Sequence, residues 1–277
     1  MLVEMEGVNY TYPSSEEPVL RNIDLRIGRG EYILLAGPSG CGKSTLARIL
    51  NGLIPNFYGG KLEGKILVDG KDPRKTPTYE MALTVGFVFQ NPENQLFFSD
   101  VEREIAFGLE NLGLPPHEIR RKVEDAIRKY GLENLRHRSP AELSGGQKQK
   151  VAIASVMVME PKLLVLDEPT ANLDPISAVK VLGLVKREVL ERKISAIVIE
   201  HRVELVLPYV DRVVVMDRGR IVGDGEPYSV IQENTGLIGR PAIFDVYARL
   251  RAKGFPLHRW PRTPEQLAED LKRILQG

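Results

Sequence analysis

The sequence has few of the features that place a protein outside the cell or within a membrane. It contains one cysteine, Cys41, among 277 residues, which excludes a disulfide framework and a cysteine-based metal site. The first residues, Met1 to Glu6, lack the basic and then apolar pattern of a signal peptide. No apolar run approaches the roughly 20 residues that span a bilayer. We therefore expect a cytoplasmic protein that contacts a membrane only through a partner.

An excess of charge of one sign is also missing. The chain has 38 basic and 37 acidic residues, for a formal net charge of +1. Proteins that bind nucleic acid usually carry a basic surplus, so we expect no nucleic-acid partner. Hydrophobic residues make up 43% and charged residues 27% of the chain. These shares are ordinary for globular proteins that bury a substantial core.

The most informative segment that is present is a glycine-rich loop. It fits the pattern G-x-x-x-x-G-K-[ST], and its residues are Gly37, Pro38, Ser39, Gly40, Cys41, Gly42, Lys43, Ser44 and Thr45. The apolar run 33–36 suits a buried strand, and residues 46–50 continue as a helix. Glycines let backbone N–H groups surround an anion, which the helix N-terminus also attracts. We expect Lys43 to contact the phosphates of a nucleoside triphosphate and Ser44 to bind Mg²⁺.

Strands and helices alternate along most of the chain. The segments that suit strands are residues 2–10, 19–27, 64–68, 84–89, 162–166 and 194–199, followed by a hairpin at 212–224. Helices are expected to predominate from 99 to 159, beginning at a Ser99 cap, and another helix follows Asp174 and Pro175. This alternation favours an α/β fold with a largely parallel sheet covered on both faces.

The end of the chain is expected to form two short helices, residues 241–253 and 263–276. The second begins with a capping box from Thr263 to Gln266. Its apolar stripe consists of Leu267, Leu271, Ile274 and Leu275. This stripe could pack against the chain's own core or form a subunit interface, and the sequence favours neither.

Several polar residues follow predicted strands. Asp167 and Glu168 come directly after the buried strand 162–166, and Gln90 and His201 also follow strands. Ligands of open α/β sheets bind at the carboxyl ends of the strands, so these side chains can converge there. Asp167 would hold Mg²⁺ through water, and Glu168 would polarise the attacking water.

A further motif, Leu-Ser-Gly-Gly-Gln at residues 143–147, completes a set that resembles the ATPase subunit of ATP-binding-cassette (ABC) transporters. The resemblance covers residues 1 to about 232. It implies a P-loop NTPase α/β core with a mostly parallel sheet, an antiparallel β subdomain and a helical subdomain at about 91–159. Residues 233–277 would then be a C-terminal helical extension that could serve dimerisation.

The resemblance also implies roles for individual residues. Tyr12 would stack on adenine, although a tyrosine at this position could equally be strand-edge packing. Gln90 would contact Mg²⁺ and the attacking water, Glu168 would be the general base, and His201 would contact the γ-phosphate. The residues that would act in the partner subunit's site are Ser144, Gly145, Gly146, Gln147 and Asp174. We expect the segment 144–146, at a helix N-terminus, to be an anion site with no other role in its own chain.

A narrower resemblance, to the ATPases of energy-coupling-factor transporters, rests on residues 87–97, 106–108 and 111–115. These transporters take up vitamins or transition-metal ions. The resemblance implies a peripheral ATPase on the cytoplasmic face of the cell membrane, using Mg²⁺ and ATP. Its partners would be a second ATPase subunit, identical or different, a transmembrane coupling subunit and a substrate-binding membrane subunit.

The sequence departs from the family pattern in two places. Residues 171–174 read Ala-Asn-Leu-Asp instead of Ser-Ala-Leu-Asp, and Arg202 follows His201 where many members have aspartate. Two alternatives remain. One is the ATPase of a conventional importer fed by a periplasmic binding protein, and the other is a non-transport cassette protein of DNA repair or the ribosome.

The segment 91–108 is the expected docking surface for the membrane subunit. It combines the aromatic side chains of Phe97 and Phe98 with acidic ones, which are Glu93, Asp100, Glu102 and Glu104. Aromatic residues suit a groove that receives a helix, and acidic residues suit a basic partner. The alternative is that the two phenylalanines belong to the core of the helical subdomain.

Overall fold

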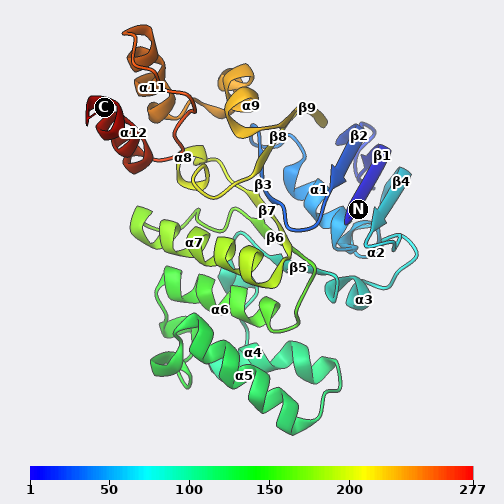
Figure 1. The fold of residues 1–277 in the computed structure, drawn as a ribbon. Coiled ribbons are helices and arrows are strands. Elements are labelled where there is room, and N and C mark those ends of the chain that lie inside the picture. Colours follow the sequence, from blue (N-terminus) through cyan, green and yellow to red (C-terminus); the bar gives the residue numbers. More distant parts are fainter. Residues whose placement is uncertain (277) are drawn as a thin grey trace.

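The structure, a computed structural model, describes residues 1–276. Its centre is a six-stranded sheet in the order β5-β6-β7-β3-β8-β9, in which all neighbours run parallel except β8 and β9 (Figure 1). The strands are β3 (Tyr32–Ala36), β5 (Val85–Val88), β6 (Leu163–Asp167), β7 (Ser195–Ile199), β8 (Arg212–Asp217) and β9 (Arg220–Gly225). The predicted mostly parallel sheet is confirmed.

Alternate residues of the central strands enter two different hydrophobic cores. On β3, Leu34 packs into the core shared with the helices α4 to α9, and Ile33 packs into the core shared with α1 and the antiparallel sheet. All five residues of β6 and all five of β7 are buried. Strands buried on both faces read as continuous apolar runs, which is why the sequence reveals them.

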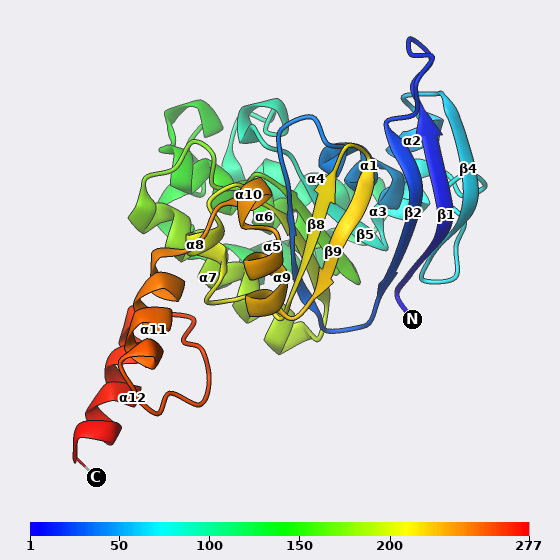
Figure 2. The same ribbon diagram turned by 90° about the horizontal axis from the view of Figure 1, so that it is seen from above.

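A separate antiparallel sheet of three strands lies beside this layer, in the order β2-β1-β4 (Figure 2). The strands are β1 (Val3–Thr11), β2 (Leu20–Ile27) and β4 (Lys61–Val68). The expected strand 64–68 begins earlier, at Lys61, because its first residues pair with Asn9 to Thr11 of β1. That extension depends on a distant partner, and residues 61–65, in which Leu62 is the single apolar side chain, give little local signal for it.

Besides the short 3₁₀ helices Pro92–Asn94, Glu133–Leu135 and Pro140–Glu142, the remaining elements are α-helices. They are α1 (Lys43–Leu50), α2 (Leu53–Asn56), α3 (Thr78–Ala82), α4 (Val101–Asn111), α5 (Pro116–Tyr130), α6 (Gly145–Met157), α7 (Pro175–Arg192), α8 (Val203–Val206), α9 (Pro227–Glu233), α10 (Thr235–Ile238), α11 (Ala242–Ala252) and α12 (Pro264–Gln276). Within residues 1–276, no helix has the length and apolar character required to cross a membrane.

Helices α4, α5 and α6 lie together at one end of the molecule, on the lower side of Figure 1. The cap of α4 is Asp100, whose Oδ1 accepts a hydrogen bond of 2.9 Å from the backbone N–H of Arg103. The expectation of a Ser99 cap is therefore wrong by one residue. The Ser99 hydroxyl instead donates to Asp100, so it supports the capping carboxylate.

Glu104 of α4 is not part of an exposed docking face. Its side chain is only 4% exposed, and Oε2 accepts hydrogen bonds of 2.9 Å from the backbone N–H groups of Phe97 and Phe98. Phe97 is itself 66% exposed and contacts Phe98 and Phe107 through its ring. The expectation of an exposed acid at Glu104 is wrong, because the carboxylate is used to hold the preceding loop.

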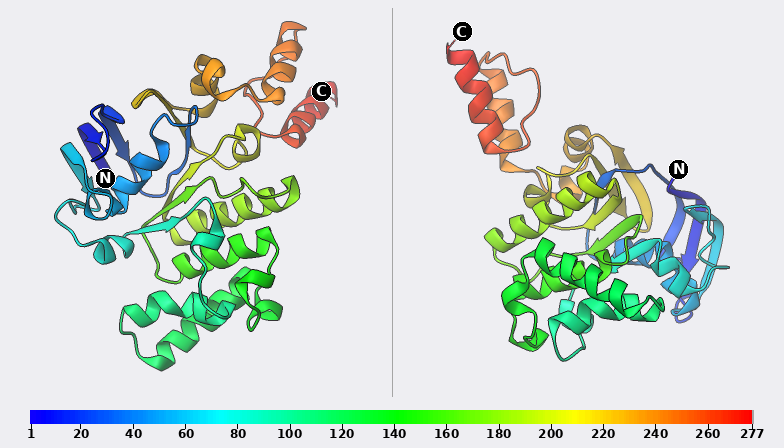
Figure 3. Two further views of the ribbon diagram at one scale, coloured as in Figure 1. Left: turned by 180° about the vertical axis from the view of Figure 1, so that it is seen from behind. Right: turned by 60° about the horizontal axis from the view of Figure 1, so that its bottom comes forward.

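The C-terminal helices α11 and α12 project from the body as a pair (Figure 3). Leu267 of the apolar stripe is buried in a small cluster with Tyr247 and Leu257, and Leu271 and Ile274 pack partly against it. By contrast, Leu275 is 74% exposed. Most side chains of the stripe therefore pack within the extension itself. Leu275 is the leucine of the stripe that stays exposed and could contact another surface.

Candidate functional site

The glycine-rich loop 37–45 connects β3 to α1 and needs glycine at two points. Gly37 has a φ of 145° and Gly42 a φ of 110°, values in the region that disfavours side chains. A Cβ on Gly37 would lie 2.1 Å from the carbonyl oxygen of Met216. A Cβ on Gly42 would lie 2.8 Å from Cδ2 of Leu20. At these two positions the loop is therefore pressed against β8 and β2, with no room for a side chain.

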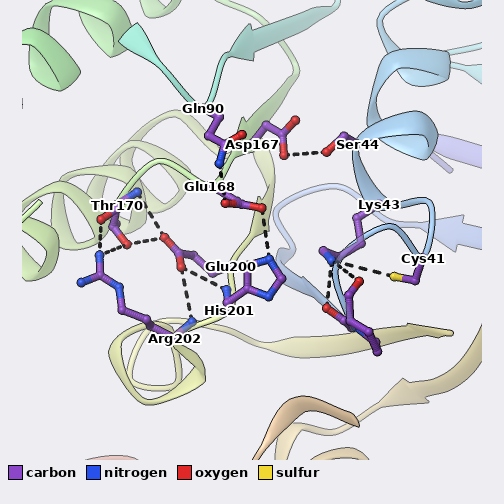
Figure 4. A network of polar contacts seen from close by, with 12 residues as sticks. Cys41, Lys43, Ser44, Gln90, Asp167, Glu168, Thr170, Glu200, His201 and Arg202 are labelled. Carbon is purple, nitrogen blue, oxygen red and sulfur yellow. Dashed lines mark hydrogen bonds and ion pairs between the residues drawn. The ribbon is translucent and has the colours of Figure 1, made fainter. Parts of the chain in front are cut away.

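Lys43 lies inside this loop. Its side chain is 5% exposed, and Nζ donates hydrogen bonds of 2.8 Å to the carbonyl oxygen of Gly37 and 2.9 Å to that of Pro38 (Figure 4). Cys41 Sγ lies 3.8 Å from the same Nζ, and burial raises the pKa of this thiol. The ammonium group is thus held against the loop by two of the loop's own carbonyl oxygens.

Ser44 and Asp167 come together at the carboxyl edge of the sheet. The Ser44 hydroxyl donates a hydrogen bond of 3.0 Å to Oδ1 of Asp167, and burial raises the pKa of Asp167 while this bond opposes the shift. Within residues 1–276 no group of three or more His, Cys, Asp or Glu side chains suits a metal. A hydroxyl and one carboxylate nevertheless fit Mg²⁺, which keeps several waters and takes other ligands from phosphates.

Glu168 is positioned by two polar neighbours from the adjacent strand ends. Its Oε2 accepts a hydrogen bond of 2.7 Å from Nε2 of Gln90, and its Oε1 lies 3.1 Å from Nε2 of His201 (Figure 4). Its backbone φ is 48°, an uncommon conformation for a residue other than glycine. The backbone N–H of Glu168 donates to the carbonyl oxygen of Ile199 on β7. The three predicted side chains are therefore brought together at one point.

Tyr12 directly follows β1 and contacts Thr45 at the end of the glycine-rich loop. Its hydroxyl is 3.1 Å from Oγ1 of Thr45, and its ring meets that of Tyr10 edge to face at a centroid distance of 4.8 Å. Tyr12 is partly exposed. Part of its ring is therefore exposed to solvent beside the loop, while the ring also packs against Tyr10 at the edge of the strand.

The motif at 144–147 has a role in its own chain, contrary to expectation. Ser144 caps α6, because its hydroxyl accepts from the N–H of Gln147 and the Gln147 side chain accepts from the N–H of Ser144. A Cβ on Gly145 would lie 3.3 Å from Cδ2 of Leu173, and one on Gly146 would lie 3.4 Å from Cβ of Ser177, so both glycines face the segment 172–177. Among residues 1–276, no hydrogen bond of Ser144 or Gln147 reaches the loop 37–45.

Asp174 caps α7 in a similar way. Its Oδ1 accepts hydrogen bonds of 3.0 Å from the N–H groups of Ile176 and Ser177. Hydrogen bonding from Ser177 lowers the pKa of Asp174 below its usual range. Ser144, Gly145 and Asp174 are all exposed, so this second group of predicted residues lies on the surface near two helix N-termini.

Sequence reasoning missed a buried network behind His201. It joins Thr170, Glu200 and Arg202 through hydrogen bonds between side chains and backbone groups (Figure 4). The sequence marks Arg202 only as a departure from the family pattern. A sequence signal was available in Glu200, because an acidic residue that ends a fully buried strand requires a polar partner.

Comparison with known proteins identifies the family. The model described as "ABC transporter" matches residues 20–171. A relative from Pyrococcus horikoshii, whose name assigns it to the ATP-binding proteins of ABC transporters, is 47% identical over 275 residues, which is 98% of this chain and 96% of the relative. Two relatives from Methanosarcina, with similar names, are longer, and this chain spans only 41% and 37% of their lengths.

Two solved structures are also similar. The structure of cbiO1 from Clostridium perfringens, described as part of the ABC transporter complex cbiONQ, has a TM-score of 0.77 at 37% identity and covers 91% of this chain and 97% of its own. A dimeric ATP-binding cassette bound to ADP and phosphate has a TM-score of 0.70 at 26% identity, covering 81% of this chain and 98% of its own. ATPases of this family generally use Mg²⁺ and ATP. With its P-loop α/β fold and its antiparallel sheet, the chain belongs to the ABC transporter family and is similar to proteins named as ATP-binding proteins of that family.

Proposed function

We propose that this chain is the motor ATPase of an energy-coupling-factor importer that takes up a vitamin or a transition-metal ion. The observation that carries the proposal is the likeness to cbiO1, which covers 91% of this chain. Residues 1–232 alone make up a smaller share of the chain than this, so the likeness includes part of the C-terminal extension. A conventional importer would share the cassette without requiring this extension.

We further propose that two groups of residues bind ATP. The phosphate-loop half-site comprises residues 37–45 with Tyr12, Gln90, Asp167, Glu168 and His201. Lys43 contacts the β- and γ-phosphates, the loop N–H groups surround them, and Tyr12 stacks on adenine. Ser44 and Asp167 would hold Mg²⁺, with Gln90 near it. When bound, the ion neutralises phosphate charge.

Within this half-site Glu168 is the general base. Its carboxylate accepts a proton from the water that attacks the γ-phosphate. The contact of 2.7 Å with Gln90 and the contact of 3.1 Å with His201 limit the rotamers of Glu168. Gln90 orients the water, and His201 contacts the γ-phosphate. Neither of these residues replaces the carboxylate as proton acceptor.

The signature half-site comprises Ser144 to Gln147 together with Asp174. We propose that it completes the phosphate-loop half-site of a second subunit, identical or different, so that each ATP lies between two subunits. The exposed N-terminus of α6 supports this, because a helix of 13 residues offers N–H groups and a positive dipole end to an anion. The dimeric cassette with ADP and phosphate supports it by similarity.

The remaining partners would be membrane proteins. A transmembrane coupling subunit would hold the dimer at the cytoplasmic face, and a separate membrane subunit would bind the transported solute. Nucleic acid is not among the partners. Phe97, which is 66% exposed, is a better docking residue than the buried Glu104.

The test is co-purification in detergent after expression with the neighbouring genes of the source genome. Recovery of a coupling subunit and a small solute-binding membrane subunit would support the proposal. Recovery of a transporter that depends on a periplasmic binding protein would overturn the importer class but leave the ATPase assignment intact. Association with ribosomes or DNA-repair proteins would overturn both the transport role and the membrane location.

A further inference from the structure

Glu200 is a buried carboxylate that connects two functional loops. Its side chain is 3% exposed. Oε1 accepts from the hydroxyl of Thr170 and, at 3.1 Å, from the backbone N–H of Thr170. Oε2 accepts from the backbone N–H groups of His201, at 3.1 Å, and Arg202, at 3.4 Å. One carboxylate thus ties Thr170, in the loop after β6, to His201 and Arg202, in the loop after β7.

Arg202 holds the same loop from its other side. Its NH2 group donates to the carbonyl oxygen of Thr170 and, at 2.6 Å, to the Thr170 hydroxyl oxygen. Its NH1 group donates to the carbonyl oxygen of Leu173 at 3.3 Å. The guanidinium fork therefore spans the loop 170–173, which leads directly into Asp174. A lysine, with a single nitrogen, could not make this pattern.

We propose that Thr170, Glu200 and Arg202 are positioning residues that couple His201 to Asp174. The inference rests on the proposed function, in which His201 acts on the ATP of its own subunit and Asp174 on that of the partner subunit. A shift of His201 as its own site closes is passed through Glu200 and Thr170 to the loop that carries Asp174. In this chain Arg202 is the residue that fixes the loop from its other side.

The network is better suited to positioning than to stability. Replacing buried charged groups by apolar residues of similar size is often neutral for stability, although removal of one partner alone is costly. Thr170 is fully buried, so Thr170→Val preserves its shape and removes only the hydroxyl. Thr170→Ser keeps the hydroxyl and loses only a methyl group. The pair of variants therefore separates the hydrogen bonds from the packing.

The experiment compares Thr170→Val, Thr170→Ser, Arg202→Lys and Arg202→Met with the wild type. Arg128→Met, at an exposed arginine of α5, is the matched control. For each protein we would measure the melting temperature, the dissociation constant for ATP, and kcat and KM of the ATPase. Misplacing catalytic groups by about 1 Å can cost up to ~10²-fold in rate, so we expect kcat to fall at least about tenfold in Thr170→Val and both Arg202 variants.

We expect Thr170→Val, Arg202→Lys and Arg202→Met to lose kcat while their affinity for ATP stays unchanged. Thr170→Ser and Arg128→Met should keep the wild-type rate. Wild-type kcat in Thr170→Val and Arg202→Lys would overturn the inference. A fall in both kcat and melting temperature in every variant of Thr170 and Arg202, including Thr170→Ser, would show that the network has only a structural role. That result would also overturn the inference. A wild-type chain without ATPase activity would instead count against the proposed function.

The coupling itself is tested in mixed dimers. Glu168→Gln in one subunit leaves only the other site active, and Thr170→Val is then placed either in the active or in the silent subunit. We expect the remaining rate to fall in both arrangements, since His201 acts in one site and Asp174 in the other. A loss in only one arrangement would contradict coupling between the two sites.

Discussion

The two half-sites differ in how far one chain completes them. In the phosphate-loop half-site, side chains from three strand ends meet, with Glu168 in contact with both Gln90 and His201. In the signature half-site, Ser144 and Asp174 cap their own helices and remain exposed. The carboxyl edge of a parallel sheet brings side chains together within one domain, whereas helix N-termini at the surface present groups outward.

This difference indicates how activity is controlled. In the proposed site, the first half-site binds a nucleotide alone, since all of its proposed phosphate contacts come from one chain. On the same proposal, the second half-site acts only when another subunit faces it. The helix-capping hydrogen bonds of Ser144 keep the second half-site ordered in the absence of another subunit, because an uncapped helix end would fray. Substitutions in each half-site test this difference.

The largest effect is expected for Glu168→Gln. The amide keeps the size of the side chain but cannot accept the proton of water, and loss of a general base costs about 10²–10⁴ in rate. ATP binding should be unchanged, because Glu168 makes none of the proposed phosphate contacts. Steady-state ATPase assays and ATP titration would check this, with Glu133→Gln, at an exposed position, as control. A kcat within twofold of the wild type would remove Glu168 from its proposed role.

The next prediction separates the half-sites directly. Hydrogen bonds to charged groups contribute about 1.5–3 kcal/mol, so Lys43→Ala should weaken ATP binding by about 10- to 10²-fold. Ser144→Ala should leave the ATP affinity of the isolated chain unchanged but reduce ATP-driven dimers. The measurements are ATP titration and light scattering with ATP and with ADP, both in the Glu168→Gln background. If Ser144→Ala lowered affinity in the monomer as much as Lys43→Ala, the signature residues would belong to the site of their own chain.

Much of this arrangement can be predicted from the sequence, for physical reasons that differ between residues. Asp167 ends one strand that is buried on both faces and Gln90 follows another, and such strands appear as apolar runs. The network of Thr170 and Arg202 could not be predicted, because it joins residues far apart in the sequence whose side chains have no periodic pattern. The burial of Glu104 was missed for a related reason. Its partners are two backbone N–H groups of a loop, and these carry no side-chain signal.

Glu104 offers a smaller effect, on the segment that links Gln90 to α4. Glu104→Ala leaves two N–H groups, of Phe97 and Phe98, without their acceptor, which typically costs about 1–3 kcal/mol in the free energy of unfolding. Urea denaturation would measure this, and Glu104→Gln, which keeps an acceptor oxygen, is the matched control. An unchanged unfolding midpoint in Glu104→Ala would mean that the loop finds other hydrogen bonds.

The same residue gives a pH dependence. Burial raises the pKa of Glu104 above its ordinary value of 4.5, so the folded state binds the proton more readily than the unfolded state. The ionised carboxylate therefore lowers stability above its folded pKa, and this cost disappears as the pH falls through that pKa. The wild type should gain stability relative to Glu104→Gln over this range. A constant difference between the two proteins at all pH values would contradict the shift.

The smallest effect on the folded chain is expected for Leu275→Ser, and it tests whether the C-terminal extension keeps two subunits together before ATP arrives. Leu275 is 74% exposed, and surface substitutions usually change stability by less than about 0.5 kcal/mol. Leu267→Ala, at a buried position of the same helix, should by contrast destabilise the extension. If Leu275 lies in a contact between subunits, Leu275→Ser lowers the nucleotide-free mass measured by light scattering without a change in melting temperature. We expect that result, because burial of a leucine contributes about 1.5–3 kcal/mol, enough to shift a weak dimer. An unchanged mass would mean that ATP alone brings the half-sites of two subunits together.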